Sequence, residues 1–259
     1  MSPASPPGSP EAVGSSSAMP GPQSAGVDGA LVETIAARLA TARERIAHAG
    51  GDPELVRIVA VTKGFGPAEV AAGFAAGLRE FGENYADELI AKWGTLGRAA
   101  TWHFLGAVQR NKVGRLCPYV DCWQAVARLV EGEAIQRHRT QASPVPTGHG
   151  LEPVSMFVEV ETTGLAGRGG CAPQQVPSVV AGLRELGCRV DGLMTVAPAG
   201  DAGLARAAFD RVARLRDELG LKELSMGMSE DLEQAVAAGT TMVRLGTALF
   251  GPRPRRRGL

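Results

Sequence analysis

Apolar residues along this chain fall into two alternating patterns, short β-branched runs and longer stretches with helical spacing. The first helical stretch carries apolar side chains that share one face: Leu31, Ile35, Leu39, Ala42 and Ile46. This spacing predicts a helix from about residue 31, and Gly50-Gly51 marks its end. A β-branched run from Leu55 follows, so the chain enters its first predicted strand after an extra N-terminal helix.

Eight runs of this kind favour strands along the rest of the chain. They cover 55–62, 78–81, 101–105, 119–126, 154–160, 190–195, 222–225 and 242–245. Between them, helical spacing predicts helices at about 67–77, 85–96, 109–116, 128–139, in a segment ending at Gly187, and at 203–219 and 230–238. Strands that alternate with helices pair in parallel through right-handed crossovers, and eight such units can close into a barrel. We predict an α/β fold, a single (β/α)8 TIM-like barrel, with an open doubly wound sheet as the alternative.

Composition divides the 259 residues into one domain and two tails. Residues 1–28 are rich in Pro, Gly, Ser and Ala and lack the large apolar side chains needed to offset the entropy of ordering, so we expect a disordered tail. The barrel domain is expected at 29–251, with a Pro-rich surface excursion at 140–153. The last segment, 252–259, reads PRPRRRGL and is expected to be a solvated basic tail.

Charge and cysteine usage narrow the class of partners. Lys plus Arg equals Asp plus Glu, so the net charge of zero gives no reason to expect nucleic acid or an anionic membrane. No apolar run approaches the roughly 20 residues that cross a bilayer, and the first segment lacks the pattern of a secretory signal. The four cysteines form neither a C-x-x-C pair nor a metal-ligand spacing. We therefore expect reduced thiols in a cytoplasmic protein, with no metal site.

Residues Leu55 to Gly66, reading LVRIVAVTKGFG, hold the most informative chemistry. Lys63 stands at the carboxyl end of the predicted strand, directly before the glycines that stop it. Burial of an ammonium group is costly, so a lysine at this place usually has a partner or a chemical use. An apolar wall lowers the pKa of the amine and makes it a nucleophile for an aldehyde, with which it forms an imine. The alternative is a lysine that extends to the barrel rim and pairs with a carboxylate.

Further residues also stand at predicted strand ends, which meet at one mouth of a barrel. They are Asn84, His103, Met194, Ser225, Arg244, Gly246 and Thr247. Three of them have a structural alternative: Asn84 as a turn former, His103 as a satisfied core residue and Arg244 as the partner of a carboxylate.

The loops after the last two strands are the ones that often bind phosphate in barrels. Small residues and hydroxyls in these loops, Ser229, Gly246 and Thr247, fit that use. Alternatively Ser229 is a helix N-cap and Gly246 a turn residue. Glu230 and Asp231 would repel an anion unless they point outward.

Nucleotide-binding loops, paired glycosidase carboxylates, a Ser/His/Asp arrangement and zinc spacing are not visible in the sequence. Six motifs, in order along residues 31 to 251, nevertheless match a known pattern. They are Val59-Ala60-Val61-Thr62-Lys63, Phe81-Gly82-Glu83-Asn84-Tyr85, Trp102-His103-Phe104-Leu105-Gly106 with Gln109, Asn111 and Lys112, Gly192-Leu193-Met194-Thr195-Val196-Ala197-Pro198, Met226-Gly227-Met228-Ser229 with Asp231, and Arg244-Leu245-Gly246-Thr247 to Phe250-Gly251. In these motifs the chain resembles the pyridoxal phosphate homeostasis protein family.

This resemblance implies the barrel of the alanine racemase N-terminal domain, with pyridoxal 5′-phosphate (PLP) bound as a Schiff base on Lys63. It also implies that Ser229, Gly246 and Thr247 hold the phosphate, with Asn84, His103, Met194, Ser225 and Arg244 as further cofactor-binding candidates. Members of the family have no established catalytic activity and are thought to keep free PLP low and supply it to other proteins. The chain departs from the family's Ser-Lys-x-Gly loop, since it reads Ala166-Gly167-Arg168-Gly169-Gly170; Arg168 would supply the charge of that lysine.

Three functions are therefore compared. The first is a PLP carrier without catalytic residues, which passes PLP to transient apoenzyme partners and works as a monomer. The second is a PLP-dependent amino-acid racemase, which needs a second acid/base that an added C-terminal β domain supplies in the racemase fold. Against this function, the chain stops eight residues after Gly251 and has only two tyrosines, Tyr85 and Tyr119. The third is a Schiff-base aldolase without cofactor, for which His103 is the one candidate acid/base. We favour the carrier.

Overall fold

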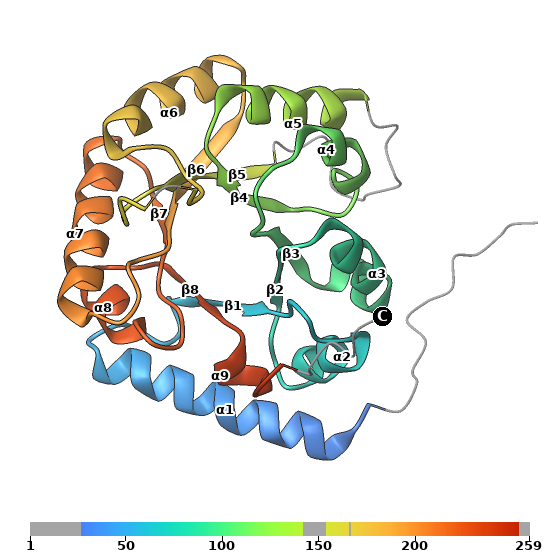
Figure 1. Ribbon diagram of the computed structural model, residues 1–259. Coiled ribbons are helices and arrows are strands. Elements are labelled where there is room, and N and C mark those ends of the chain that lie inside the picture. Colours follow the sequence, from blue (N-terminus) through green and yellow to red (C-terminus); the bar gives the residue numbers. More distant parts are fainter. Residues whose placement is uncertain (1–26, 142–153, 166, 254–259) are drawn as a thin grey trace, which may run out of the picture.

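The fold is a ring of strands surrounded by helices, as Figure 1 shows. The computed structural model describes residues 27–141, 154–165 and 167–253. Most of the predicted tails at 1–28 and 252–259 and of the excursion at 140–153 lies outside the described residues, so those predictions stay predictions.

Eight parallel strands close into a barrel in chain order. Their bounds are β1 (Arg57–Val61), β2 (Glu80–Glu83), β3 (Thr101–Phe104), β4 (Cys122–Val126), β5 (Ser155–Val160), β6 (Arg189–Thr195), β7 (Glu223–Ser225) and β8 (Met242–Leu245). Each strand pairs with the next, and β8 returns to pair with β1, from Arg57 opposite Met242 to Ala60 opposite Leu245. This closure confirms the predicted (β/α)8 barrel and excludes the open sheet.

The helices lie outside the strands, and one of them precedes the barrel. They are α1 (Gly29–His48), α2 (Pro67–Ala75), α3 (Ala86–Leu96), α4 (Arg110–Leu116), α5 (Leu129–Gln141), α6 (Val176–Glu185), α7 (Ala202–Glu218), α8 (Leu232–Ala237) and α9 (Thr247–Phe250), with short 3₁₀ turns at Gly97–Ala99 and Pro173–Gln175. The extra helix α1 is confirmed, and it packs against α2, α8 and α9. Helix α9 was not predicted, because four residues are too few to show a helical period.

The buried apolar side chains form two cores. The larger lies between strands and helices and includes Trp102, Phe81 and Phe209. The smaller fills the barrel itself and includes Val59, Phe157 and Met242. Adjacent residues such as Val59 and Ala60 belong to different cores, because successive side chains of a strand point to opposite faces.

The four cysteines have free thiols, and burial raises the pKa of Cys117 and Cys171 to about 11. Such thiols are poor nucleophiles at neutral pH. Across the described segments of the chain, no helix combines the length and apolarity that a bilayer span requires.

Gly192 allows β6 and β7 to approach closely. It pairs with Glu223 across the two strands, and a Cβ at this position would lie 2.2 Å from the Glu223 carbonyl oxygen. A backbone atom cannot move aside as the end of a flexible side chain can, so an added methyl group must push the strands apart.

We therefore predict that Gly192→Ala lowers the free energy of unfolding by about 1–3 kcal/mol, as overpacking does. The matched control is Gly94→Ala, since Gly94 lies within α3 and a Cβ added there would have no neighbouring atom within 4 Å; alanine there should stabilise by roughly 0.5–1 kcal/mol. Urea denaturation of both variants measures the difference. Equal stabilities would contradict the close contact.

Candidate functional site

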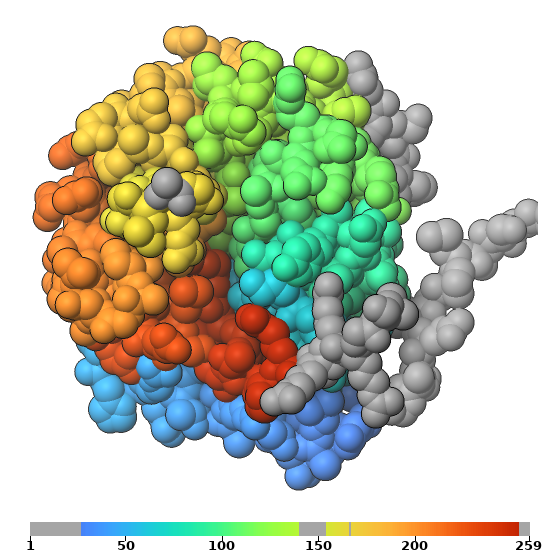
Figure 2. Space-filling view, viewed as in Figure 1, coloured from blue at the N-terminus to red at the C-terminus, as the bar shows by residue number. Residues whose placement is uncertain are grey.

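A cavity of about 770 Å³ opens at the carboxyl ends of the strands. In the space-filling view it appears as a recess near the middle of the face, where segments coloured cyan, yellow and red meet (Figure 2). Its lining comes from the ends of β1, β2, β3, β5, β6, β7 and β8 and the segments that follow them. The cavity therefore brings together residues from strand ends around most of the barrel.

Lys63 lies at one side of this cavity, two residues after the end of β1. Its side chain is half-buried, and among the described residues its amine has no hydrogen-bond or ion-pair partner. Burial lowers the pKa of the Lys63 amine, and the charge of Arg253 lowers it further, while Glu83 and Glu88 act in the opposite direction. The amine is therefore more often neutral than that of an ordinary lysine. Because no carboxylate among the described residues pairs with it, the alternative of a lysine paired with a carboxylate does not hold within the described part of the chain.

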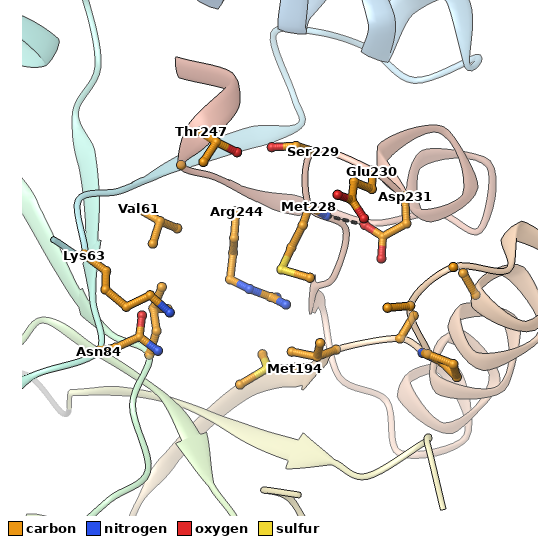
Figure 3. A pocket seen from close by; sticks show the side chains of 18 of the residues that line it. Val61, Lys63, Asn84, Met194, Met228, Ser229, Glu230, Asp231, Arg244 and Thr247 are labelled. Carbon is orange, nitrogen blue, oxygen red and sulfur yellow. Dashed lines mark hydrogen bonds between the residues drawn. The ribbon is translucent and has the colours of Figure 1, made fainter. Parts of the chain in front are cut away.

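Ser229 and Thr247 lie along another edge of the cavity than Lys63, with Thr247 on the side of Val61 (Figure 3). They belong to the loops after β7 and β8, and neither hydroxyl has a partner among the described residues. Gly246 stands beside them, and a Cβ added there would lie 3.2 Å from the Val61 carbonyl oxygen. The absence of a side chain at Gly246, which also lines the cavity, thus lets the end of β8 approach the end of β1 closely.

Contacts from α1 and α8 hold the loop that carries Ser229. The Arg45 guanidinium donates at 3.0 Å to the Ser229 carbonyl and at 2.6 and 2.9 Å to the two oxygens of Glu233. The hydrogen bond with Glu233 raises the pKa of Arg45, and Arg45 lowers the pKa of Glu233. The extra helix therefore fixes the position of a loop that faces the cavity.

Asp231, which was expected to point outward if the loop binds an anion, lines the cavity together with Glu230. Its carboxylate accepts a hydrogen bond of 2.5 Å from the Met228 N–H, so part of its charge is used inside the loop. The charge of Asp231 also favours the charged form of Arg244. Asp231 is also the N-cap of α8, so Ser229 is not that cap.

Arg244 lies between Lys63 and the two last loops and is 5% exposed. Its guanidinium donates at 2.6 Å to the Ser225 carbonyl, at 2.9 Å to the Ser225 hydroxyl and at 2.8 Å to the Thr195 carbonyl. Burial lowers the pKa of Arg244 to about 10, although Asp231 and Glu159 favour the charged form. It remains a cation at neutral pH and lines the cavity.

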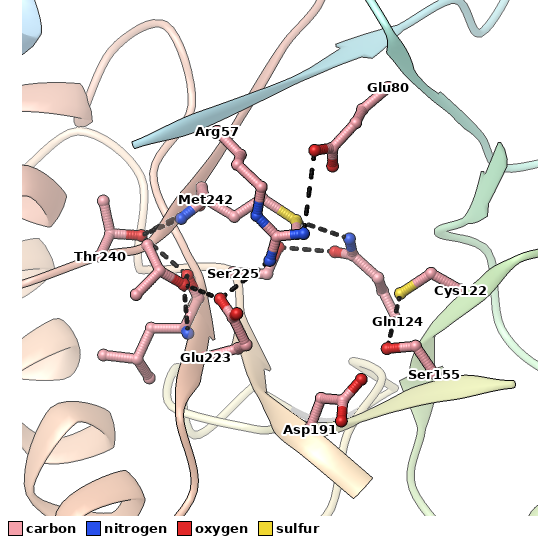
Figure 4. Close-up of polar contacts among 12 residues, drawn as sticks. Arg57, Glu80, Cys122, Gln124, Ser155, Asp191, Glu223, Ser225, Thr240 and Met242 are labelled. Atoms are coloured by element: carbon pink, nitrogen blue, oxygen red, sulfur yellow. Dashed lines mark hydrogen bonds and ion pairs between the residues drawn. The ribbon is translucent and has the colours of Figure 1, made fainter. Parts of the chain in front are cut away.

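Ser225 and His103 were expected at the cavity, but neither lines it. The Ser225 hydroxyl donates at 2.6 Å to Gln124 inside the barrel (Figure 4). Gln124 Nε2 lies 2.8 Å from His103 Nδ1, and His103 Nε2 lies 3.0 Å from Glu80. Through Ser225, this chain of side-chain contacts supports Arg244 from inside the barrel. The expectation was wrong for both because their strand positions face the barrel interior one layer below the mouth.

The remaining predicted residues meet as expected, since Lys63, Asn84, Met194, Ser229, Arg244, Gly246 and Thr247 all line the cavity. Their ligand roles stay predictions. Their convergence supports the site, because they come from five different strands or the loops after them.

Sequence reasoning missed the loop of residues 196–202, which forms one wall. The Ala197-Pro198 part of a recognised motif was its only signal. Arg168, from the loop that departs from the family pattern, also lines the cavity. Arg253 does as well, although the tail that contains it was expected to be solvated. Its place depends on the turn made by α9, for which the sequence shows no signal.

The residues fit a small molecule with an aldehyde at one end and an anion at the other. An amine without a partner among the described residues lines the same cavity as two hydroxyl donors, and Arg244 supplies a fixed positive charge there. Pyridoxal phosphate has both of these groups.

Comparisons with known proteins agree with this geometry. The family described as alanine racemase, N-terminal domain matches residues 32–254. The pyridoxal phosphate homeostasis protein of Pseudomonas aeruginosa is 38% identical over 228 residues, which cover 86% of this chain and 96% of that protein.

Solved structures show the same barrel. PipY of Synechococcus elongatus, in a structure with PLP bound, is 32% identical with a TM-score of 0.70, and the match covers 84% of this chain and 100% of that one. Alanine racemase of Corynebacterium glutamicum is 15% identical with a TM-score of 0.63, covering 88% of this chain and 63% of that one. The second likeness shows the fold alone.

The charge of Arg253 generates a prediction about Lys63. Arg253→Gln removes a cation that lowers the pKa of the amine, so the pH at which Lys63 becomes reactive should rise. Competitive labelling with an amine reagent at a series of pH values, read by mass spectrometry, measures this pH. Arg206→Gln is the control, since Arg206 pairs with Asp210 on α7. An unchanged profile in Arg253→Gln would show that Arg253 does not act on Lys63.

Proposed function

Because the chain belongs to the pyridoxal phosphate homeostasis protein family, whose barrel is the alanine racemase N-terminal domain, we propose that it binds PLP and takes part in PLP homeostasis. The observation that carries this proposal is the Lys63 amine, which has no partner among the described residues and lines one cavity together with the hydroxyl-bearing Ser229 and Thr247. The relatives' names and the PLP-bound structure of PipY support it.

In this proposal Lys63 holds PLP as a Schiff base, and Ser229, Gly246 and Thr247 hold its phosphate. Asn84, Met194 and Arg244 line the same cavity and would contact the rest of the molecule. The lowered pKa of Lys63 favours bond formation, because only the neutral amine attacks an aldehyde. A phosphate bound by hydroxyls and backbone N–H groups supplies affinity that does not depend on the covalent bond.

PLP supplies an electron sink to the enzymes that use it, but here we propose a carrier rather than an enzyme. The rim of the cavity is open, since Arg168, Met228 and Arg253 are exposed. Water therefore reaches a ligand at Lys63, which suits reversible storage better than controlled chemistry.

We further propose a cytoplasmic monomer that releases PLP to apoenzymes. The closed barrel pairs all eight strands within one chain, so no strand edge needs a second subunit. The free thiols suit a reducing compartment.

We predict that purified protein shows a visible absorption band of a Schiff base and that borohydride fixes PLP to Lys63, as peptide mass spectrometry would show. Lys63→Arg keeps the charge but cannot form an imine, so the band should be lost. The control is Lys222→Arg, at an exposed lysine just before β7, which should keep the band. A labelled residue other than Lys63 would overturn the proposed binding mode.

We also predict that the protein with bound PLP does not change the chirality of amino acids faster than free PLP does. Chromatographic analysis of D and L products over a panel of amino acids measures this. Turnover above free PLP that disappears in Lys63→Arg would show a PLP-dependent enzyme and contradict the carrier proposal.

A further inference from the structure

A buried group of charged side chains lies behind Lys63, outside the residues that line the cavity. Lys92, on α3, is 3% exposed, and its amine donates at 2.5 Å to Glu83 and at 2.9 Å to Glu88. The Glu83 carboxylate is fully buried and also accepts a hydrogen bond of 2.7 Å from the Thr62 hydroxyl. We name Glu83, Glu88 and Lys92 the α3 clamp.

The α3 clamp contacts the backbone on both sides of Lys63. The Lys92 amine donates at 2.8 Å to the carbonyl of Thr62, the residue before Lys63. The Glu88 carboxylate accepts at 2.9 Å from the N–H of Gly64, the residue after it. The chain therefore cannot shift or rotate at Lys63 without breaking a charge-assisted hydrogen bond, which is about twice as strong as a neutral one.

A gain in stability does not readily explain why the charged side chains of the α3 clamp are buried. Taking charges out of water costs several kcal/mol each, and apolar residues of similar volume often give an equal or more stable protein. Burial indeed raises the pKa of Glu83, against the effect of Lys92. A function at the neighbouring Lys63 amine accounts for this cost in free energy.

The charges of the α3 clamp also reach Lys63. Two carboxylates and one ammonium leave an excess of one negative charge when all are ionised, and both carboxylates raise the pKa of the Lys63 amine. Burial and Arg253, on the other side, lower it. Arg244 is a buried cation of the cavity lining and takes no part in the α3 clamp.

We propose that Glu88 and Lys92, together with Glu83, are positioning residues that hold Lys63 in place at the cavity and balance its charge. The inference rests on the proposed use of Lys63. It assigns a function to the α3 helix, none of whose residues lines the cavity.

Glu88 is the residue to test, because its carboxylate is 21% exposed and its replacement leaves the buried Lys92 still paired with Glu83. Glu88→Gln keeps an oxygen that accepts from Gly64 and Lys92 but removes the charge. Glu88→Ala removes both. The matched control is Glu69→Gln, whose carboxylate accepts at 2.8 Å from the Gly66 N–H in the same loop.

Competitive labelling of Lys63 tests the charge balance without any cofactor. Both Glu88 variants should shift the labelling profile of Lys63 to lower pH, since a negative charge that raises its pKa is gone, whereas Glu69→Gln should leave it in place. A profile unchanged in both Glu88 variants would overturn the electrostatic part of the proposal.

Dissociation of PLP from the loaded protein, followed by its absorption, tests the positioning part. Glu88→Ala should lose PLP at least about tenfold faster than Glu88→Gln, because small displacements of a reacting group have large kinetic effects. Equal rates in the two variants would overturn positioning. If wild type takes up no PLP, the proposed function fails, but the labelling profiles still decide whether the α3 clamp acts on Lys63.

Discussion

Pairing between the first and the last strand is the constraint on which the site depends. The parallel register from Arg57 opposite Met242 to Ala60 opposite Leu245 brings the end of β1 beside the end of β8. Lys63 thereby meets Gly246 and Thr247 although more than 180 residues separate them in the chain. An open sheet would leave these two ends at opposite edges, and no cavity would join an amine to a loop with hydroxyl donors.

Polar side chains inside the closed barrel also hold Arg244 in place at the cavity. Arg244 is held by the Ser225 hydroxyl and by two strand carbonyls, and Ser225 is held in turn by Gln124. A buried guanidinium with three hydrogen bonds has little freedom to move, so its charge is available to a ligand without reorganisation. The interior of the barrel therefore works as the support of the cavity floor.

Charges around Lys63 act from two sides, which explains how a lysine can be both accessible and reactive. Arg253 and burial favour the neutral amine, while the carboxylates of Glu83 and Glu88 favour the ammonium form. The proposed carrier needs a bond that forms readily and also breaks. A lowered pKa of the amine, which the two carboxylates keep from falling further, suits both directions. The same balance explains why charged residues of α3 are buried behind the strand end.

Sequence alone determined the barrel class, the extra helix and most of the site, because strand ends of parallel units converge by topology and apolar periodicity marks those ends. Lys63, Ser229, Arg244 and Thr247 were assigned in this way. Tertiary structure decided what depends on the direction of a side chain. His103 stands near a strand end like Lys63, yet its ring faces the barrel interior. It lies one layer below the cavity, so it supports the residues of the cavity and does not line it. The Glu88–Lys92 pair has the i,i+4 spacing of a helix, which the sequence shows. The place of Arg253 at the cavity and the contacts of the α3 clamp with Thr62 and Gly64 join segments far apart in the chain, which no local spacing encodes.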